Sequence, residues 1–129
     1  MKIFGIGIDV VEVNRISLIL NKKNNFIKRI FSNKEISQSK NTKKIYHFFA
    51  KRFAAKEAFS KALGTGVAKG LNFNEIEVRN SVSGKPSLKI TGKSLKVVKK
   101  YTKKKKVKIF LSLTDESKYA IAMVVISTL

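Results

Sequence analysis

The chain has 129 residues, of which 43% are hydrophobic and 28% charged, a balance typical of one globular domain and not of a disordered segment. It has no cysteine, which excludes disulfides and thiolate metal sites. Its formal net charge of +20 favours an acidic partner such as nucleic acid, an anionic membrane, an acidic protein or a phosphate-rich ligand. Codon drift toward lysine in an AT-rich genome explains the same charge, so charge alone does not identify the partner.

The N-terminal segment is apolar, but it does not have the form of a targeting sequence. Two glycines and Asp9 interrupt the apolar run, and no small-residue cleavage pattern follows it. No apolar stretch reaches the roughly 20 residues needed to cross a bilayer. We therefore expect no signal peptide and no membrane span, and one domain over residues 1–129.

The first predicted element is a buried strand over residues 3–13, with glycines where another backbone or a ligand must come close. Asn14 can cap a short helix that begins at Arg15. Residues 32–35, with the sequence SNKE, have the form of a capping box and predict the start of another helix.

The strongest helical signal covers residues 43–63. Its phenylalanines and alanines recur at spacings of three and four residues, which predicts one buried face. Gly64 stands where a C-cap glycine belongs, and Gly64-Thr65-Gly66 then turns the chain.

The second half of the chain alternates strand and turn signals around one helix. The predicted elements are a strand over 75–81, a turn over 83–86, a strand over 87–91, a helix over 92–103, and strands over 107–113 and 119–127. This order predicts an α+β domain with a mainly antiparallel sheet and one long helix packed on it.

Two of the eight carboxylates stand in unusual places. Asp9 interrupts an apolar strand, and Glu57 lies among alanines inside the long helix. A buried carboxylate needs a cation or hydrogen-bond donors. One carboxylate from a strand and one from a helix, meeting over a phosphate, suit Mg²⁺. The alternative is that Asp9 caps a helix or pairs with Arg15 or Arg52, and that Glu57 pairs with a lysine one turn away.

Lys61 follows Glu57 by one helical turn, so it is either the simple partner of that carboxylate or a ligand for a phosphate beside the metal. The backbone of residues 64–66 and the Thr65 hydroxyl can also approach a phosphate, although a C-cap and turn explain these residues equally well. With a single histidine and no cysteine, zinc sites and Ser–His or Cys–His nucleophiles find little support.

Taken together, three stretches resemble holo-[acyl carrier protein] synthase, the small type of 4'-phosphopantetheinyl transferase. They are GIGIDVVE at 5–12, KRFAAKEA at 51–58 continuing to Gly66, and Gly84-Lys85-Pro86 with SLTDE at 112–116. The stretches stand in the family's order and span nearly the whole chain.

This resemblance implies the family's fold and an enzyme that moves the 4'-phosphopantetheine group of coenzyme A onto a serine of acyl carrier protein. It also implies adenosine 3',5'-bisphosphate as the second product, a role in fatty acid biosynthesis, a cytoplasmic location, and a homotrimer with active sites between subunits.

The resemblance also assigns roles to individual residues. Asp9 and Glu57 would hold Mg²⁺ and, with Lys61, form the catalytic set, in which Glu57 would accept the serine proton. The residues implied to bind coenzyme A are Arg52, Lys61, Gly64, Thr65, Gly66, Gly84, Lys85 and Pro86. The residues implied to dock the acidic carrier protein are Arg15, Lys22, Lys23 and Lys28. The chain departs from many family members at Asp115, where they have a histidine.

Two interpretations from other classes compete with the enzyme. The charge and the lysine run at 103–106 are typical of a nucleic-acid-binding protein, although the aromatic residues lie mostly on a helix core face and not on a strand platform. A structural oligomer subunit without catalysis is the third interpretation.

Overall fold

A computed structural model describes residues 1–22, 24–66 and 69–129. Its elements in chain order are β1 (Lys2–Glu12), α1 (Val13–Lys22), α2 (Asn24–Ile30), α3 (Asn33–Ser39), α4 (Ile45–Leu63), a 3₁₀ turn (Phe73–Glu75), β2 (Ile76–Asn80), β3 (Pro86–Ile90), α5 (Gly92–Tyr101), β4 (Val107–Asp115) and β5 (Tyr119–Thr128). The predicted α+β class is confirmed. Among the described helices, none combines the length and apolarity needed to cross a bilayer.

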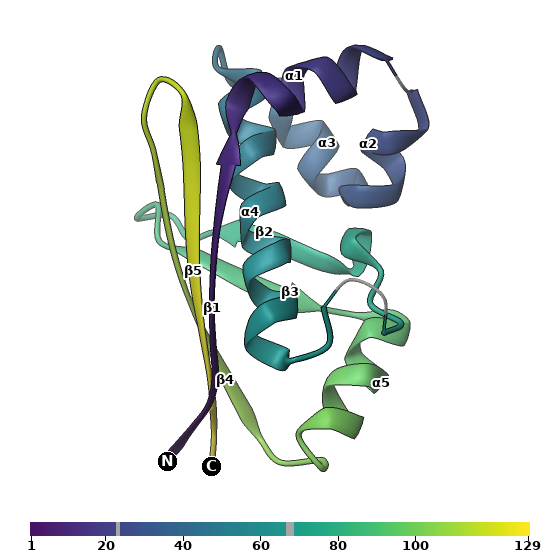
Figure 1. The fold of residues 1–129 in the computed structure, drawn as a ribbon, viewed down its shortest axis with the longest axis vertical. Helices are drawn as coiled ribbons and strands as arrows, with labels where there is room; N and C mark the ends of the chain where they lie inside the picture. The colour runs from purple at the N-terminus through teal and green to yellow at the C-terminus, as the bar shows by residue number, and fades with distance from the viewer. Residues whose placement is uncertain (23, 67–68) are drawn as a thin grey trace.

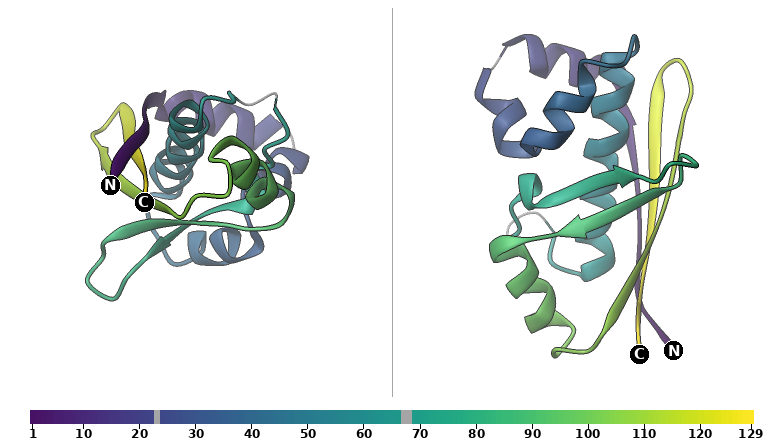
Figure 2. Two further views of the ribbon diagram at one scale, coloured as in Figure 1. Left: turned by 90° about the horizontal axis from the view of Figure 1, so that it is seen from below. Right: turned by 180° about the vertical axis from the view of Figure 1, so that it is seen from behind.

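The strands form two antiparallel groups. A three-stranded sheet has the order β1-β5-β4, and β2 pairs with β3 as a separate hairpin. The long helix α4 lies along one face of the three-stranded sheet (Figure 1). The view from behind shows that the β2–β3 hairpin crosses α4 on a side of the helix that the three-stranded sheet does not cover (Figure 2).

The packing of α4 on β1 is unusually close, and glycine makes it possible. A Cβ added at Gly7 would overlap the carbonyl oxygen of Ala58, and one added at Gly5 would overlap that of Ala62. Ala58 is fully buried and Ala62 nearly so. The glycines predicted to allow a close approach therefore admit the helix backbone itself, and they set the distance between α4 and β1.

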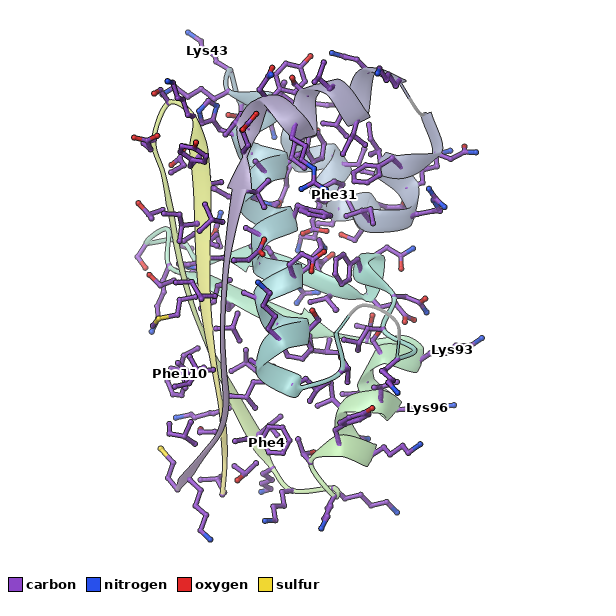
Figure 3. The ribbon with its side chains drawn as sticks, viewed as in Figure 1. Phe4, Phe31, Lys43, Lys93, Lys96 and Phe110 are labelled. Carbon is purple, nitrogen blue, oxygen red and sulfur yellow. The ribbon has the colours of Figure 1, made fainter. Side chains whose placement is uncertain are left out.

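The sheet has an inner face, toward α4, and an outer face. Side chains alternate along a strand, so Ile6, Ile8 and Val10 of β1 point outward while Val11 is buried on the inner face. The outer face is apolar and exposed: Ile6 (63%), Ile8 (56%), Val10 (58%), Phe110 (46%) and Met123 (44%). Figure 3 shows Phe110 on the side of the sheet away from α4.

The helices before α4 pack against its first half. The predicted capping box is present, because the Ser32 hydroxyl accepts a hydrogen bond from the Glu35 N–H and the Glu35 carboxylate accepts one from the Ser32 N–H. Phe31 packs against Phe49 with ring centroids 4.6 Å apart and lies between α4 and these helices (Figure 3).

The sequence did not predict α2. This helix has only seven residues and begins with two asparagines, so its local signal is weak. The ring of Phe26 lies 6.1 Å from that of Phe53 on α4. This tertiary contact stabilises a segment whose own helical propensity is poor.

Candidate active site

Asp9 is the polar residue on the inner face of β1. Ile8 and Val10 on either side point outward, so strand alternation turns the Asp9 carboxylate toward α4. Its side chain is 15% exposed, and its strand partner on β5 is Ala122. Because Ala122 has a small side chain, the Asp9 carboxylate has room to meet groups from α4.

Lys61 meets Asp9 from α4. Its Nζ lies 3.1 Å from Asp9 Oδ1 and donates a second hydrogen bond, of 3.0 Å, to the Ile8 carbonyl oxygen. The Lys61 side chain is 53% exposed, and an ammonium has three N–H donors. It therefore has the capacity to bind an anion besides these two oxygens. Among the residues that the structure describes, Asp9 forms its ion pair with Lys61 and not with Arg15 or Arg52, the partners in the alternative interpretation.

Glu57 lies one turn before Lys61 and is half-buried. Burial raises the pKa of the Glu57 carboxyl above its ordinary value, and the nearby charge of Asp9 raises it further, while Lys61 and Arg15 act in the opposite direction. The two carboxylates are therefore close enough to repel each other. A cation between them would relieve this repulsion.

The donor set at this position suits Mg²⁺. Two carboxylates supply hard oxygen ligands, and Mg²⁺ commonly takes one or two carboxylates and completes its shell with water and substrate oxygens. Within the described residues, no group of three or more His, Cys, Asp or Glu side chains gathers to form a larger metal site. The residues present thus fit the predicted magnesium pair.

A cavity of about 330 Å³ adjoins Glu57. Phe26, Ile30, Phe53 and Phe73 contribute apolar walls, and Glu57 is one of the polar residues that line it. Such a cavity suits a narrow chain with apolar and amide groups that must reach the carboxylate.

Arg52 does not join this group within one copy of the chain. It is 4% exposed, and its guanidinium carbon lies 3.6 Å from the centre of the Phe48 ring. Burial lowers the pKa of the Arg52 guanidinium, and Glu35 opposes that shift. The neighbours of Arg52 are thus Phe48 and Glu35, away from Asp9 and Lys61. Its contact with coenzyme A stays a prediction.

The Gly64-Thr65-Gly66 turn serves as the C-cap of α4. Gly64 has φ of 88° and Gly66 has φ of 60°, both in the left-handed region. The N–H groups of all three residues donate to the Ser60 carbonyl oxygen, and the Thr65 hydroxyl donates to that of Gly66. Within one copy of the chain these donors are therefore directed at the chain itself, as the C-cap interpretation of this turn predicted. A place for this turn along the nucleotide site stays a prediction.

Gly84, Lys85 and Pro86 lie at the turn of the β2–β3 hairpin, which projects from the body of the molecule (Figure 2). The hairpin tip does not join Asp9 and Glu57 in any contact described within one copy. The predicted contact of these residues with the adenine end of coenzyme A remains a prediction.

Asp115, the position at which the chain departs from the family pattern, pairs with a lysine. Lys51 Nζ lies 3.6 Å from Asp115 Oδ1, and both side chains are about one-third exposed. This ammonium offsets the charge that would repel a phosphate near Asp115.

The residues predicted to dock an acidic protein gather on the first two helices. Arg15 and Lys22 are exposed on α1, and Lys28 is exposed on α2. Lys23 lies outside the described residues. Arg15 also acts electrostatically on Glu57, so this basic surface borders the candidate site.

Sequence reasoning missed a buried ion pair directly beside Glu57. Lys56 Nζ lies 2.8 Å from Glu35 Oε1, and both side chains are fully buried. Burial lowers the pKa of the Lys56 ammonium, and the Glu35 carboxylate opposes that shift. The capping box identified Glu35, but no sequence signal links it to a lysine 21 positions away.

Comparison with known proteins decides the family. The model of the 4'-phosphopantetheinyl transferase superfamily matches residues 5–124. The chain belongs to this superfamily. It is 52% identical over 126 residues to the holo-[acyl-carrier-protein] synthase of Pelagibacter ubique (strain HTCC1062), covering 98% of each chain.

Solved structures of the superfamily share this fold. A holo-(acyl-carrier-protein) synthase from Bacillus anthracis str. Ames, in complex with CoA (3',5'-ADP), is 37% identical with a TM-score of 0.82 and full coverage of both chains. A holo-[acyl-carrier-protein] synthase from Neisseria meningitidis is 34% identical with a TM-score of 0.85, covering 98% of this chain and 99% of the other. The predicted phosphopantetheinyl transferase fold is confirmed.

The raised pKa of Glu57 predicts a stability effect. The folded protein binds the carboxyl proton more tightly than the unfolded chain does, so stability falls as pH rises from the ordinary glutamate range through the folded pKa. At pH 7, Glu57→Gln should therefore raise the Tm of metal-free protein by a few degrees, on the order of 2 °C. At about pH 4, where a glutamate is largely protonated, the difference should disappear.

Differential scanning calorimetry in EDTA measures this effect. Glu12→Gln is the matched control, since Glu12 is exposed at the end of β1 and should leave Tm unchanged. A lower Tm for Glu57→Gln at pH 7 would contradict the assignment.

Proposed function

We infer that this chain transfers the 4'-phosphopantetheine group of coenzyme A to a serine of apo-acyl carrier protein, and releases adenosine 3',5'-bisphosphate. The observation that carries the inference is the convergence of Asp9, Glu57 and Lys61 in a superfamily fold. Relatives with this fold are holo-[acyl-carrier-protein] synthases, one of them in complex with CoA. The nucleic-acid alternative has only the net charge and the lysine run at 103–106 in its favour and is not proposed.

The residues supply what a phosphoryl transfer requires. The serine oxygen forms a bond to phosphorus while the bond to the leaving phosphate breaks, so negative charge accumulates on the leaving group. Lys61 places an ammonium beside Asp9, with the capacity to neutralise part of that charge. Glu57 accepts the serine proton, and its raised pKa brings its basicity nearer to neutral pH.

Asp9 and Glu57 would together hold Mg²⁺. When bound, the ion supplies Lewis-acid stabilisation of the phosphate oxygens. The apolar cavity beside Glu57 would receive the pantetheine arm, because Phe26, Phe53 and Phe73 line a space that leads to the carboxylate.

Mass spectrometry tests the reaction directly. Protein incubated with coenzyme A, Mg²⁺ and apo-acyl carrier protein should convert the carrier to its phosphopantetheinyl form, and EDTA should abolish the conversion. Asp9→Asn should lower kcat/KM at least roughly 100-fold, comparable to the loss seen when one preorganised hydrogen-bond donor is removed from an active site. Glu12→Gln, which alters another carboxylate of β1, should stay near the wild-type rate. Near-normal turnover of Asp9→Asn would contradict the metal assignment.

The acidic carrier protein would dock on the basic surface of α1 and α2. Lys22→Glu should raise KM for the carrier protein severalfold and leave KM for coenzyme A unchanged, because Lys22 is exposed at the end of α1. Arg15→Glu should affect both the carrier KM and kcat, since Arg15 also acts on Glu57.

Lys96→Glu on α5 is the matched control for total charge, because it makes the same charge change on an exposed residue of another helix. Steady-state kinetics at two salt concentrations measures all three variants. Equal effects of Lys22→Glu and Lys96→Glu would show that only net charge matters and would contradict a localised docking surface.

The outer face of the sheet supports a homotrimer. Ile6, Ile8 and Val10 present a continuous exposed apolar row, and Phe110 and Met123 extend it across the sheet. Contiguous exposed apolar patches are typical of interaction surfaces. We propose that this face is buried between copies of the chain. The cytoplasmic location stays a prediction.

Light scattering coupled to size exclusion measures the assembly. The wild type should have a trimer mass, and Ile8→Lys should dissociate it, because a charge would enter the apolar contact. Leu18→Lys is the control, since Leu18 is similarly exposed (52%) but lies on α1. A monomeric wild type, or a trimer unaffected by Ile8→Lys, would contradict the proposed interface.

A further inference from the structure

The Lys56–Glu35 pair lies inside the protein and is satisfied on every side. The Lys56 ammonium donates to Glu35 Oε1 at 2.8 Å, to the Phe73 carbonyl at 2.9 Å and to the Ile76 carbonyl at 2.5 Å. These three acceptors use all its donors. Glu35 also accepts from the N–H groups of Ser32 and Val78, at 2.9 and 3.0 Å. One buried pair thus joins α4 to α3, to the 3₁₀ turn and to β2.

The position of this pair relative to Glu57 is what suggests a role in the reaction. Successive residues of a helix are turned by about 100°, so Lys56 and Ala58 flank Glu57 on its two sides. Ala58 is fixed by the close contact of its carbonyl with Gly7 of β1. Lys56 is fixed on the other side by its three hydrogen bonds. Glu57 therefore projects from the helix between two anchored neighbours.

The same pair also holds one wall of the cavity. The Phe73 carbonyl accepts from Lys56, and the Phe73 side chain lines the space beside Glu57. A shift of the pair would move both the carboxylate and this aromatic wall.

Stability alone gives a poor reason for such a pair. The cost of removing two charges from water commonly cancels their attraction, and apolar replacements of buried ion pairs are often as stable. The directional hydrogen bonds of the pair do, however, fix the positions of the segments that they join.

We propose that the Lys56–Glu35 pair is a positioning device, which fixes Glu57 and Phe73 relative to Asp9 so that the carboxylates can share one divalent ion. Lys56 and Glu35 are positioning residues, since they act through Glu57 and Phe73. This inference depends on the proposed function for its kinetic readout and on the paired carboxylates for its binding readout.

The test uses the full chain and Mn²⁺ as the probe ion. The double variant Lys56→Met/Glu35→Gln removes both charges and keeps the shapes and the amide acceptor for Val78 N–H. We expect it to fold, with a wild-type circular dichroism spectrum.

The Kd of this double variant for Mn²⁺, measured by electron paramagnetic resonance, should rise roughly tenfold. Its kcat should fall by about 10- to 100-fold, the range found for groups that orient metal ligands. KM for the carrier protein should not change, because α1 and α2 carry the docking surface.

A matched control alters a neighbouring ion pair. Arg79 Nε lies 2.6 Å from Glu77 Oε2, and Glu77 Oε1 accepts from the Ser32 hydroxyl at 2.8 Å, so this pair joins α3 to β2 without a hydrogen bond to α4. Glu77→Gln/Arg79→Gln should keep the wild-type Kd for Mn²⁺ and kcat. Equal losses in the two double variants would show a general effect of loosening this junction and would overturn the proposal.

The remaining outcomes are also decisive. A folded Lys56→Met/Glu35→Gln with wild-type Mn²⁺ affinity and kcat would overturn the proposal. If that variant does not fold, Glu35→Asp decides, because it keeps both charges and withdraws the carboxylate by one methylene. Weaker Mn²⁺ binding by Glu35→Asp supports positioning, and unchanged binding overturns it. A wild type that binds Mn²⁺ but transfers no phosphopantetheine refutes the proposed function, and the Mn²⁺ comparison still tests the pair.

Discussion

The contact between the α4 backbone and β1 is the constraint on which the rest of the structure depends. The carbonyls of Ala58 and Ala62 occupy the space that side chains at Gly7 and Gly5 would fill. Glu57 directly precedes Ala58, and Asp9 follows Gly7 by two residues. Any larger side chain at these glycines would push the helix outward and separate the carboxylates. The glycines at positions 5 and 7 are therefore needed for the geometry of the candidate site.

The net charge of +20 does not show how the individual charged groups are paired inside this protein. The charge of Asp9 makes ionisation of Glu57 less favourable, and Lys61 compensates from the helix. Such a pair costs folding stability, and carboxylates with perturbed pKa values cluster at functional sites. Glu35 and Lys56, in contrast, are fully neutralised by each other and by backbone groups.

The two faces of β1 differ in chemistry, because the inner face carries the Asp9 carboxylate and the outer face is apolar. Its alternation directs Asp9 toward α4 and directs Ile8 and Val10 to the outer face. The candidate site and the proposed interface thus lie on opposite faces of one strand. The packing of α4 fixes the inner face, and the proposed contact between copies would fix the outer face. This arrangement explains how a small chain can combine a polar site with a large exposed apolar surface.

Local signals identified many elements correctly. The capping box at Ser32, the long helix with Gly64 at its end, and Asp9 as a polar interruption of an apolar strand are all properties of short segments, and all appear in the structure. The resemblance of three short stretches to a known family indicated the fold and the chemistry, because these stretches are recognisable as local sequence patterns.

Only the tertiary structure decided which side chains meet. Lys61 binds Asp9 across 52 positions, Lys56 binds Glu35 across 21, and Arg52 packs on Phe48. The sequence by itself determined which faces are apolar and where helices begin and end, since periodicity and capping act over a few residues. It could not determine the partner of a charged group, because that depends on how distant segments are brought together by the packing of α4 against β1.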